Sequence, residues 1–325
     1  MKSRNKIYSI ALFVTLSFIS FGFALKHKKS LKVIATKVQS PFIVVLGTAQ
    51  DGGYPHAGCK KECCNKFYEG KEGRHYVSCI ALIDPLTKER WLFDCTPDFT
   101  TQLHILDSIY PVEGTGITGI LLTHAHIGHY TGLMYLGREA MNTKDIPVYA
   151  MPRMRKFLRE NGPWSQLVNL HNIDIKTLRK DSTFQLNDRI AVTPFLVPHR
   201  DEYSETIGYR ISTANSNVIF IPDIDKWQKW DKKIAMIVKN NDYLFLDGTF
   251  FKDGELSGVK MQEVPHPFIE ETMQLLAPLS DRDKLKVYFI HMNHTNPALT
   301  GDTAAVNEIE KKEFHIAHEK EIFVL

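Results

Sequence analysis

Three histidines, His124, His126 and His129, lie close together directly after an apolar segment, residues 117–122. Such a segment is typical of a buried strand. Neutral imidazole is the commonest metal ligand among side chains. Two imidazoles separated by one residue at the end of a strand can point at one ion, and a third can approach from the start of the next element. The segment therefore predicts a metal site, with zinc, iron and manganese as candidate ions.

Other residues that can bind metals also follow predicted strands along the chain. Residues at strand ends meet at one edge of a sheet, which is a common place to assemble a site. An ion with an open position lowers the pKa of a bound water to about 7, so that the resulting hydroxide can attack an ester or phosphoester. Core packing alone is a poor explanation for five such strand ends, namely those at His124, His199, Asp223, Asp247 and His291.

The histidine segment resembles the His-x-His-x-Asp-His motif of the metallo-β-lactamase superfamily, and the resemblance extends over most of the chain. It implies an αββα sandwich of the α/β class, in which two mixed β-sheets pack face to face between helices. It also places Asp223 and His291 in the catalytic centre. The ligands that the resemblance implies are His124, His126 and His199 for a first metal, His129 and His291 for a second, and Asp223 as the bridge between them.

One position departs from that motif, because Gly128 stands where the superfamily has an aspartate. The second metal would then keep only His129, His291 and the shared Asp223. We therefore expect a second site that is weak, differently filled or empty. Asp247 is a candidate substitute, although an aspartate before a glycine is also typical of a turn in which the carboxylate caps the backbone.

A cluster of cysteines forms a second candidate site. Cys59, Cys63 and Cys64 end a loop that contains three glycines and a proline, which is too irregular for a helix or strand. In an exported protein a disulfide is one expectation. A structural zinc is the other, with His294 or His56 as a further ligand. The spacing leaves both interpretations open.

Four segments are similar to a narrower branch of the superfamily, that of coenzyme PQQ synthesis protein B. Members of that branch, and related phosphodiesterases of phosphonate metabolism, carry a cysteine-bound structural zinc near the same loop. The resemblance thus favours zinc at Cys59, Cys63, Cys64 and His294. The segments that carry it are residues 46–55, 93–98, 246–250 and 294–297.

Three functions follow as hypotheses from these features. The first is an exported metal-dependent hydrolase that uses one or two zinc ions on a small-molecule substrate. The second is an iron-dependent oxygenase of PQQ biosynthesis, and the third is a non-catalytic binding protein with a degenerate second site at Gly128. A β-lactamase proper is not expected, because the motif departs at Gly128 and the cysteine loop is foreign to those enzymes.

The first 24 residues have the pattern of a secretory signal peptide. Lys2, Arg4 and Lys6 precede an apolar stretch at 7–24, which ends in the small-x-small sequence Gly22-Phe23-Ala24. This pattern predicts a periplasmic or secreted protein with one domain over residues 25–325. An uncleaved anchor is the alternative, because the stretch is nearly long enough to span a bilayer.

Composition and charge are those of a globular protein with a sizeable core. The 325 residues are 43% hydrophobic and 24% charged, and the formal net charge is +3. The three basic residues of the signal segment account for that excess. We therefore expect no nucleic-acid partner and, after cleavage of the signal, no stable membrane contact. The substrate and the oligomeric state are not specified by the sequence.

The apolar patterns also predict the elements that must position these residues. Asp94 and Asp98 are expected either to orient the site histidines or to occupy a turn and a helix cap. Helices are predicted over 97–106, 152–160, 227–238 and 267–276 and from residue 129 onward. Strands are predicted over 42–47, 76–83, 91–95, 117–122, 146–150, 184–186, 190–197, 206–212, 218–221, 243–246 and 286–290.

Overall fold

The computed structural model describes residues 39–325 and contains two seven-stranded β-sheets in that part of the chain. The predicted signal segment, residues 1–24, lies outside the described residues. The strands of the first sheet are, in spatial order, β14 (Ile322–Val324), β1 (Phe42–Gly47), β2 (Cys79–Asp84), β3 (Glu89–Phe93), β4 (Gly119–Leu121), β5 (Ile146–Ala150) and β6 (Ile173–Thr177). Those of the second sheet are β13 (His315–Ile316), β12 (Val287–Ile290), β11 (Tyr243–Asp247), β10 (Asn217–Ile221), β9 (Ile207–Ser212), β8 (Ile190–Leu196) and β7 (Phe184–Asn187).

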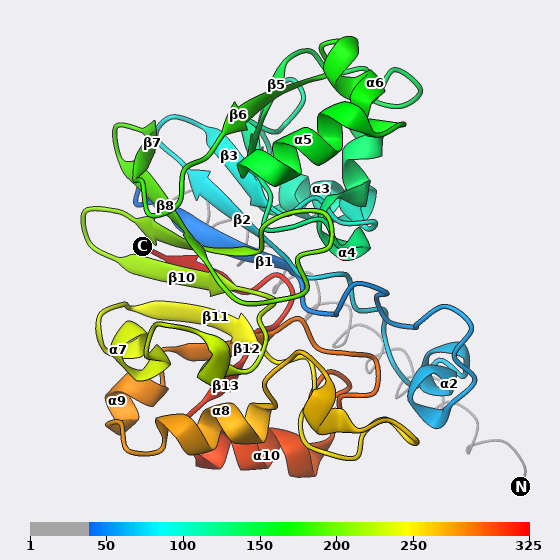
Figure 1. The fold of residues 1–325 in the computed structure, drawn as a ribbon, viewed down its shortest axis with the longest axis vertical. Helices are drawn as coiled ribbons and strands as arrows, with labels where there is room; N and C mark the ends of the chain where they lie inside the picture. Colours follow the sequence, from blue (N-terminus) through cyan, green and yellow to red (C-terminus); the bar gives the residue numbers. More distant parts are fainter. Residues whose placement is uncertain (1–38) are drawn as a thin grey trace, which may run out of the picture.

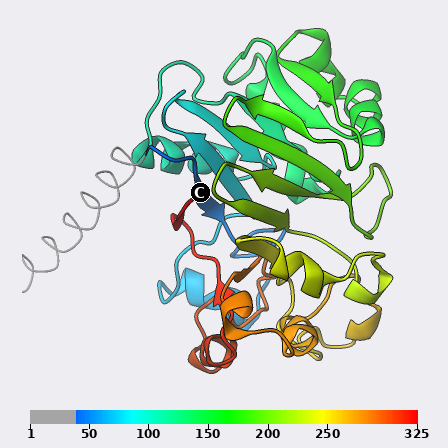
Figure 2. The same ribbon diagram turned by 90° about the vertical axis from the view of Figure 1, so that its left-hand side faces the viewer.

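Most helices lie on the outer sides of the two sheets, and the sheets face each other (Figures 1 and 2). The helices are α2 (Glu62–Tyr68), α3 (Phe99–Ile109), α4 (Ile127–Tyr130), α5 (Pro152–Glu160), α6 (Trp164–Asn169), α7 (Ile234–Lys239), α8 (Ile269–Leu276), α9 (Asp281–Lys284) and α10 (Thr303–Lys311), and the 3₁₀ turns are η1 (Thr131–Leu136), η2 (Trp227–Lys229) and η3 (Met261–Glu263). This arrangement confirms the αββα sandwich expected from the sequence.

Three apolar layers hold the sandwich together. The central layer joins side chains of both sheets, such as Phe93 of β3 and Phe220 of β10. An outer layer packs the first sheet against α3, α5 and α6, and another packs the second sheet against α7, α8 and α10. Because most strands are covered on both faces, they appear in the sequence as nearly continuous apolar runs.

Parallel pairing brings the functional strand ends to one edge. In the second sheet β10, β11 and β12 run parallel, and in the first sheet β3 and β4 do so. Asp223 follows β10, Asp247 ends β11 and His291 follows β12, while Asp94 and His124 follow the parallel pair of the first sheet. The carboxyl ends of parallel strands lie side by side, so residues distant in sequence meet there.

The helix predicted over 227–238 is wrong as a single element. The chain forms the short turn η2 and then α7, with extended backbone at Trp230 between them. The indole of Trp227 donates to Thr272 Oγ1, and that of Trp230 donates to the Leu196 carbonyl. Buried indoles need such acceptors, and we attribute the break to the geometry that serves both. The sequence analysis also missed α2, α6, α9, α10, β6, β13 and β14.

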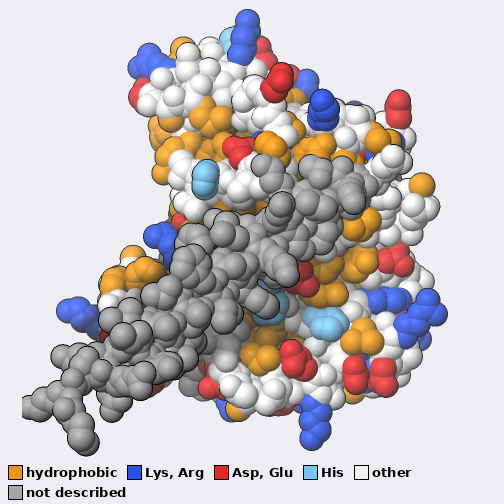
Figure 3. Space-filling model, turned by 180° about the vertical axis from the view of Figure 1, so that it is seen from behind, with side chains coloured by type: hydrophobic (Ala, Val, Ile, Leu, Met, Phe, Trp, Pro, Cys, Tyr) orange, Lys and Arg blue, Asp and Glu red, His pale blue; other side chains and the backbone are white. Residues whose placement is uncertain are grey.

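The surface visible in Figure 3 carries acidic and basic side chains intermixed. Within residues 39–325, none of the helices is long and apolar enough to cross a bilayer.

Candidate metal centre

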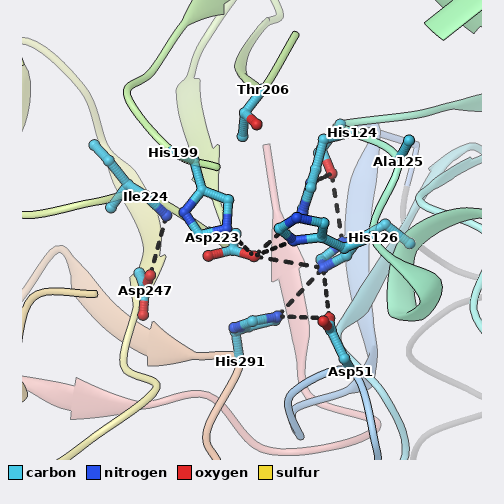
Figure 4. Close-up of polar contacts among 12 residues, drawn as sticks. Asp51, His124, Ala125, His126, His199, Thr206, Asp223, Ile224, Asp247 and His291 are labelled. Atoms are coloured by element: carbon cyan, nitrogen blue, oxygen red, sulfur yellow. Dashed lines mark hydrogen bonds and ion pairs between the residues drawn. The ribbon is translucent and has the colours of Figure 1, made fainter. Parts of the chain in front are cut away.

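The first group of predicted ligands comes together at the edge where the strands end. His124, His126, His199 and Asp223 each offer one ligand atom, and these atoms lie within 4.8 Å of one another. Asp223 Oδ2 is 3.2 Å from Nε2 of both His124 and His199, and 3.8 Å from His126 Nδ1. Figure 4 shows these side chains converging on the Asp223 carboxylate.

The unpaired atoms of this group fit a bound cation. His124 Nε2, His126 Nδ1, His199 Nε2 and Asp223 Oδ1 are buried and have no hydrogen bond of suitable geometry. Buried polar atoms in native proteins are nearly always paired. Three imidazole nitrogens and a carboxylate that lack partners are the donor set of a zinc or iron site, so the residues fit the group that the motif implies.

A second group lies beside the first and shares Asp223 with it. His129, His291 and Asp223 are its predicted members, but the structure adds Asp51. Asp51 Oδ1 is 3.0 Å from His129 Nε2 and 3.4 Å from His291 Nε2. The expectation of a group with only three members was therefore wrong, since it overlooked a carboxylate from the loop after β1. The signal that could have revealed Asp51 is its position just past a strand, like that of the other ligands.

Hydrogen bonds fix the orientation of the histidines from the first sheet. His129 Nδ1 donates to Asp94 Oδ2 at 2.7 Å. His124 Nδ1 donates at 3.0 Å to Thr123 Oγ1, which in turn donates to Asp94. Because Nδ1 carries the proton in both rings, Nε2 of each is left as a lone pair that faces the site. The predicted orienting role of Asp94 is confirmed.

An equivalent arrangement supports His291 from the second sheet. His291 Nδ1 donates at 3.0 Å to Thr249 Oγ1, which donates at 2.7 Å to Asp247 Oδ1. The Thr249 backbone N–H also donates to Asp247 Oδ1. Asp247 thus makes the capping contacts that one of the two expectations described. It lies outside the second group but forms a further candidate group with His266 and His291.

Asp98 does not act on the histidines as predicted. Its Oδ1 accepts from Arg74 at 3.0 Å, and its Oδ2 accepts from the Val77 backbone N–H at 2.9 Å. It occupies the N-cap position of α3, as the alternative expectation had it, although its side chain makes no capping bond. The aspartate is instead used to attach residues 74–77 to the start of that helix.

His266 belongs to the centre and was missed in the sequence. Its Nδ1 donates to Asp247 Oδ2 at 2.9 Å and lies 3.2 Å from Asp223 Oδ1. Burial lowers the pKa of His266, but the charges of Asp247 and Asp223 outweigh it and raise the pKa to about 9. The charged imidazole lies beside the Asp223 carboxylate. In the sequence, nothing in the spacing around His266 distinguishes it from a surface histidine.

The cysteine cluster forms a separate group with His294. The four residues offer ligand atoms within 4.8 Å of one another, and all five described cysteines have free sulfurs. His294 Nδ1 lies 3.6 Å from Cys63 Sγ and 3.5 Å from Cys64 Sγ. Burial and the neighbouring His56 lower the pKa of His294 to about 4, so its imidazole is neutral and able to bind a metal. This geometry favours a metal over a disulfide.

Two side chains of the centre are partly exposed to solvent. The side chains of Asp51 and His126 are 15% and 12% exposed, whereas the other residues of the two histidine groups are at most 2% exposed. His126 Nε2 donates at 3.1 Å to Glu202, which lies on the surface.

A family model described as a β-lactamase superfamily domain matches residues 89–292. Coenzyme PQQ synthesis protein B of Xanthomonas axonopodis pv. citri (strain 306) is 24% identical over 303 residues, which cover 85% of this chain and 97% of that protein. The protein of the same name from Methylorubrum extorquens (strain PA1) is 24% identical over 300 residues, with the same shares covered.

Solved structures show the same fold. The crystal structure of Zn²⁺-bound PqqB from Methylobacterium extorquens matches with a TM-score of 0.75 and 23% identity, and covers 87% of this chain and 100% of that chain. A diphosphatase of the PhnP family matches with a TM-score of 0.64 and 18% identity, and covers 88% of this chain and 97% of that chain. The architecture is thus that of PqqB.

Proposed function

Since the chain belongs to the β-lactamase superfamily, we propose that it is a metal-dependent hydrolase of an ester or phosphoester-type bond. The single observation that carries the proposal is the pair of histidine–aspartate groups that share Asp223 at the strand ends. Adjacent metal sites with a shared carboxylate suit hydrolysis, because two ions can stabilise both the attacking and the leaving oxygen.

Each residue of the centre then has a defined task. His124, His126 and His199 would hold a first ion, His129 and His291 would hold a second, and Asp223 belongs to both groups. When bound, zinc supplies Lewis acidity and lowers the pKa of water. His266 fixes the Asp223 carboxylate through its contacts with Asp223 and Asp247. The half-exposed Glu202 accepts a hydrogen bond from His126 Nε2 and thereby orients this partly exposed ring.

The cysteine cluster is proposed to hold a structural zinc. Three sulfurs and one imidazole make a closed four-ligand set, which is typical of structural rather than catalytic zinc. Zn²⁺-bound PqqB is a structural relative of this chain. Export into the periplasm remains a proposal from the signal pattern, whose residues 1–24 lie outside the described part.

An iron-dependent oxygenase of PQQ biosynthesis is the second candidate function. It is favoured by the similarity to coenzyme PQQ synthesis protein B over 97% of that protein's length. Imidazole and carboxylate ligands also suit iron. The signal pattern argues against it, since the precursor peptide of that pathway is made in the cytoplasm. A non-catalytic metal-binding protein is the third candidate.

The test is elemental analysis of the purified protein together with hydrolysis of bis(p-nitrophenyl) phosphate and p-nitrophenyl acetate. We expect zinc, hydrolysis of one of the two compounds, and loss of one metal equivalent and of hydrolysis in His126→Ala. Bound iron with oxygen consumption would favour the oxygenase instead. Metal without turnover of either compound would favour the binding protein, and a wild type without metal at neutral pH would refute all metal-dependent functions.

A further inference from the structure

Gly128 and Asp51 occupy the same small region, where the superfamily motif has a single aspartate. A Cβ atom on Gly128 would lie 2.6 Å from Asp51 Cα and 2.5 Å from Asp51 Oδ1. Real Cβ atoms do not approach other atoms so closely, so no larger residue fits at 128 while Asp51 keeps its place. Gly128 is not among the residues with positive φ, which means that space rather than backbone conformation requires the glycine.

The atoms around Asp51 Oδ1 repel one another unless a proton or a metal cation lies between them. His129 and His291 both use Nδ1 as a donor to Asp94 and Thr249, so their Nε2 atoms present lone pairs. The two Nε2 atoms are 3.3 Å apart, and each lies within 3.4 Å of the Asp51 carboxylate. Converging acceptors of this kind are what a divalent cation requires.

The backbone beside Asp51 is tied to the segment that carries His291. The Gln50 N–H donates to the Met292 carbonyl, and the Met292 N–H donates to the Thr48 carbonyl, both at 2.8 Å. Ala49 also forms a β-bridge with Met292. The backbone next to Asp51 is therefore hydrogen-bonded to the segment that carries His291. Figure 4 shows the two side chains next to each other.

We propose that Asp51 is the carboxylate ligand of the second metal, in place of the aspartate of the motif, and that Gly128 is the gap that admits it. The second site is then complete, with Asp51, His129, His291 and Asp223. The change at Gly128 is a relocation of the ligand rather than a loss of the site. This inference rests on the metal-dependent function proposed above.

The experiment measures zinc content and zinc affinity, independently of any substrate. The full chain is loaded with Zn²⁺, freed of excess ion and analysed for bound zinc, and its affinity is measured by calorimetric titration. The variants are Asp51→Asn, which keeps the shape of the side chain, and Gly128→Ala, which alters no ligand. Gly73→Ala is the matched control, because a Cβ there meets nothing within 4 Å and the backbone φ is ordinary.

We expect Asp51→Asn and Gly128→Ala each to lose one zinc equivalent or to bind it at least about 10-fold more weakly, as even outer partners of a site have effects of that size. Gly73→Ala should bind zinc like the wild type. The zinc equivalent lost in Asp51→Asn should come from a different site than the one lost in His126→Ala. The double variant Asp51→Asn/His126→Ala should therefore lose two zinc equivalents. Should Gly128→Ala fail to fold, Asp51→Asn alone decides.

The two proposals fail in different ways. If the wild type holds zinc at both histidine groups and Asp51→Asn retains both ions, the role of Asp51 is refuted while the proposed function stands. If the wild type fills only the group of His124, His126 and His199, the relocated site is also refuted. A wild type without zinc at either histidine group refutes the proposed function and this inference together.

Discussion

At the scale of single residues, the centre is organised by what each imidazole does with its second nitrogen. His129 and His291 each donate from Nδ1 to an acceptor that belongs to an Asp–Thr pair, Asp94 with Thr123 or Asp247 with Thr249. Such outer partners fix the tautomer and the direction of the lone pair. The direction in which each of these imidazoles presents Nε2 thus depends on the residue that accepts from its Nδ1.

Asp94→Asn should weaken the second metal site without removing a ligand. The neutral amide loses the charge that holds the His129 proton, so we expect about 10–100-fold weaker zinc binding at that site. Zinc titration of the purified variant measures the effect. Asp98→Asn is the matched control. Asp98 is buried like Asp94, but it lies at the start of α3 and accepts hydrogen bonds from Arg74 and the Val77 backbone instead of a histidine. Equal effects of both variants would contradict the proposed orienting role.

At the scale of elements, strand ends do most of the positioning. Asp94 and His291 each follow a strand with a positive φ, 69° and 64°, which turns the backbone sharply at the edge of the sheet. A non-glycine residue in that region costs about 1–3 kcal/mol. The buried hydrogen bonds of both side chains hold the backbone in this conformation, so part of the folding energy is used to shape the site.

The segment between β1 and α2 links the histidine centre to the cysteine cluster. It carries Asp51 near its start and Cys59 near its end, and Tyr54 in between donates its hydroxyl to the Cys63 carbonyl. His294 of the cluster follows His291 of the histidine centre by three positions. These two segments connect the cysteine cluster to Asp51 and His291 of the second histidine group. Neither segment carries a histidine of the first group.

Cys64→Ser should therefore weaken the second site more than the first. Loss of an ion from the cysteine cluster would make the segments that carry Asp51 and His291 less rigid. His124, His126 and His199 lie on other segments of the chain. We expect about a 10-fold loss of zinc affinity at the second site, measured by titration. The first site in the same protein is the internal control, and equal weakening of both sites would point to general destabilisation instead.

At the scale of the whole molecule, the histidine centre depends on the packing of the two sheets against each other. Strand β4 of the first sheet leads into the segment that carries His124, His126 and His129, whereas His199, Asp223 and His291 follow strands of the second sheet. Between the sheets, the ring of Phe93 packs edge-on against Tyr209 and Phe220, with centroids 5.3 Å and 6.0 Å away. Any slip between the sheets would separate the two halves of the site.

Phe93→Ala should destabilise the protein strongly. A buried phenylalanine replaced by alanine leaves a cavity and costs about 3–5 kcal/mol. Denaturant unfolding of the metal-loaded protein measures the free energy of unfolding. Phe184→Ala on the edge strand β7 is the matched control, because Phe184 is only partly buried, and it should cost clearly less. Similar losses for both would show that the inter-sheet core is less important than we infer.

The sequence by itself indicated the fold class, through its resemblance to the metallo-β-lactamase superfamily, and most of the candidate ligands. Nearly continuous apolar runs marked the central strands, and His124, His126, His129, His199 and His291 could be identified because each follows such a run. Local patterns of this kind depend on burial and on the direction of a strand, and both leave a trace in the order of residues. The departure at Gly128 was equally visible in the sequence.

Only the tertiary structure decided what replaces the missing aspartate. Asp51 lies far from Gly128 along the chain, and no spacing rule relates the two. Their pairing follows from the packing of the loop after β1 against α4, which is a contact between distant segments. The same reason hid His266, whose role is set by Asp223 and Asp247 on neighbouring strands. Sequence patterns report local geometry, whereas a shared ion or proton depends on distances between elements that only packing fixes.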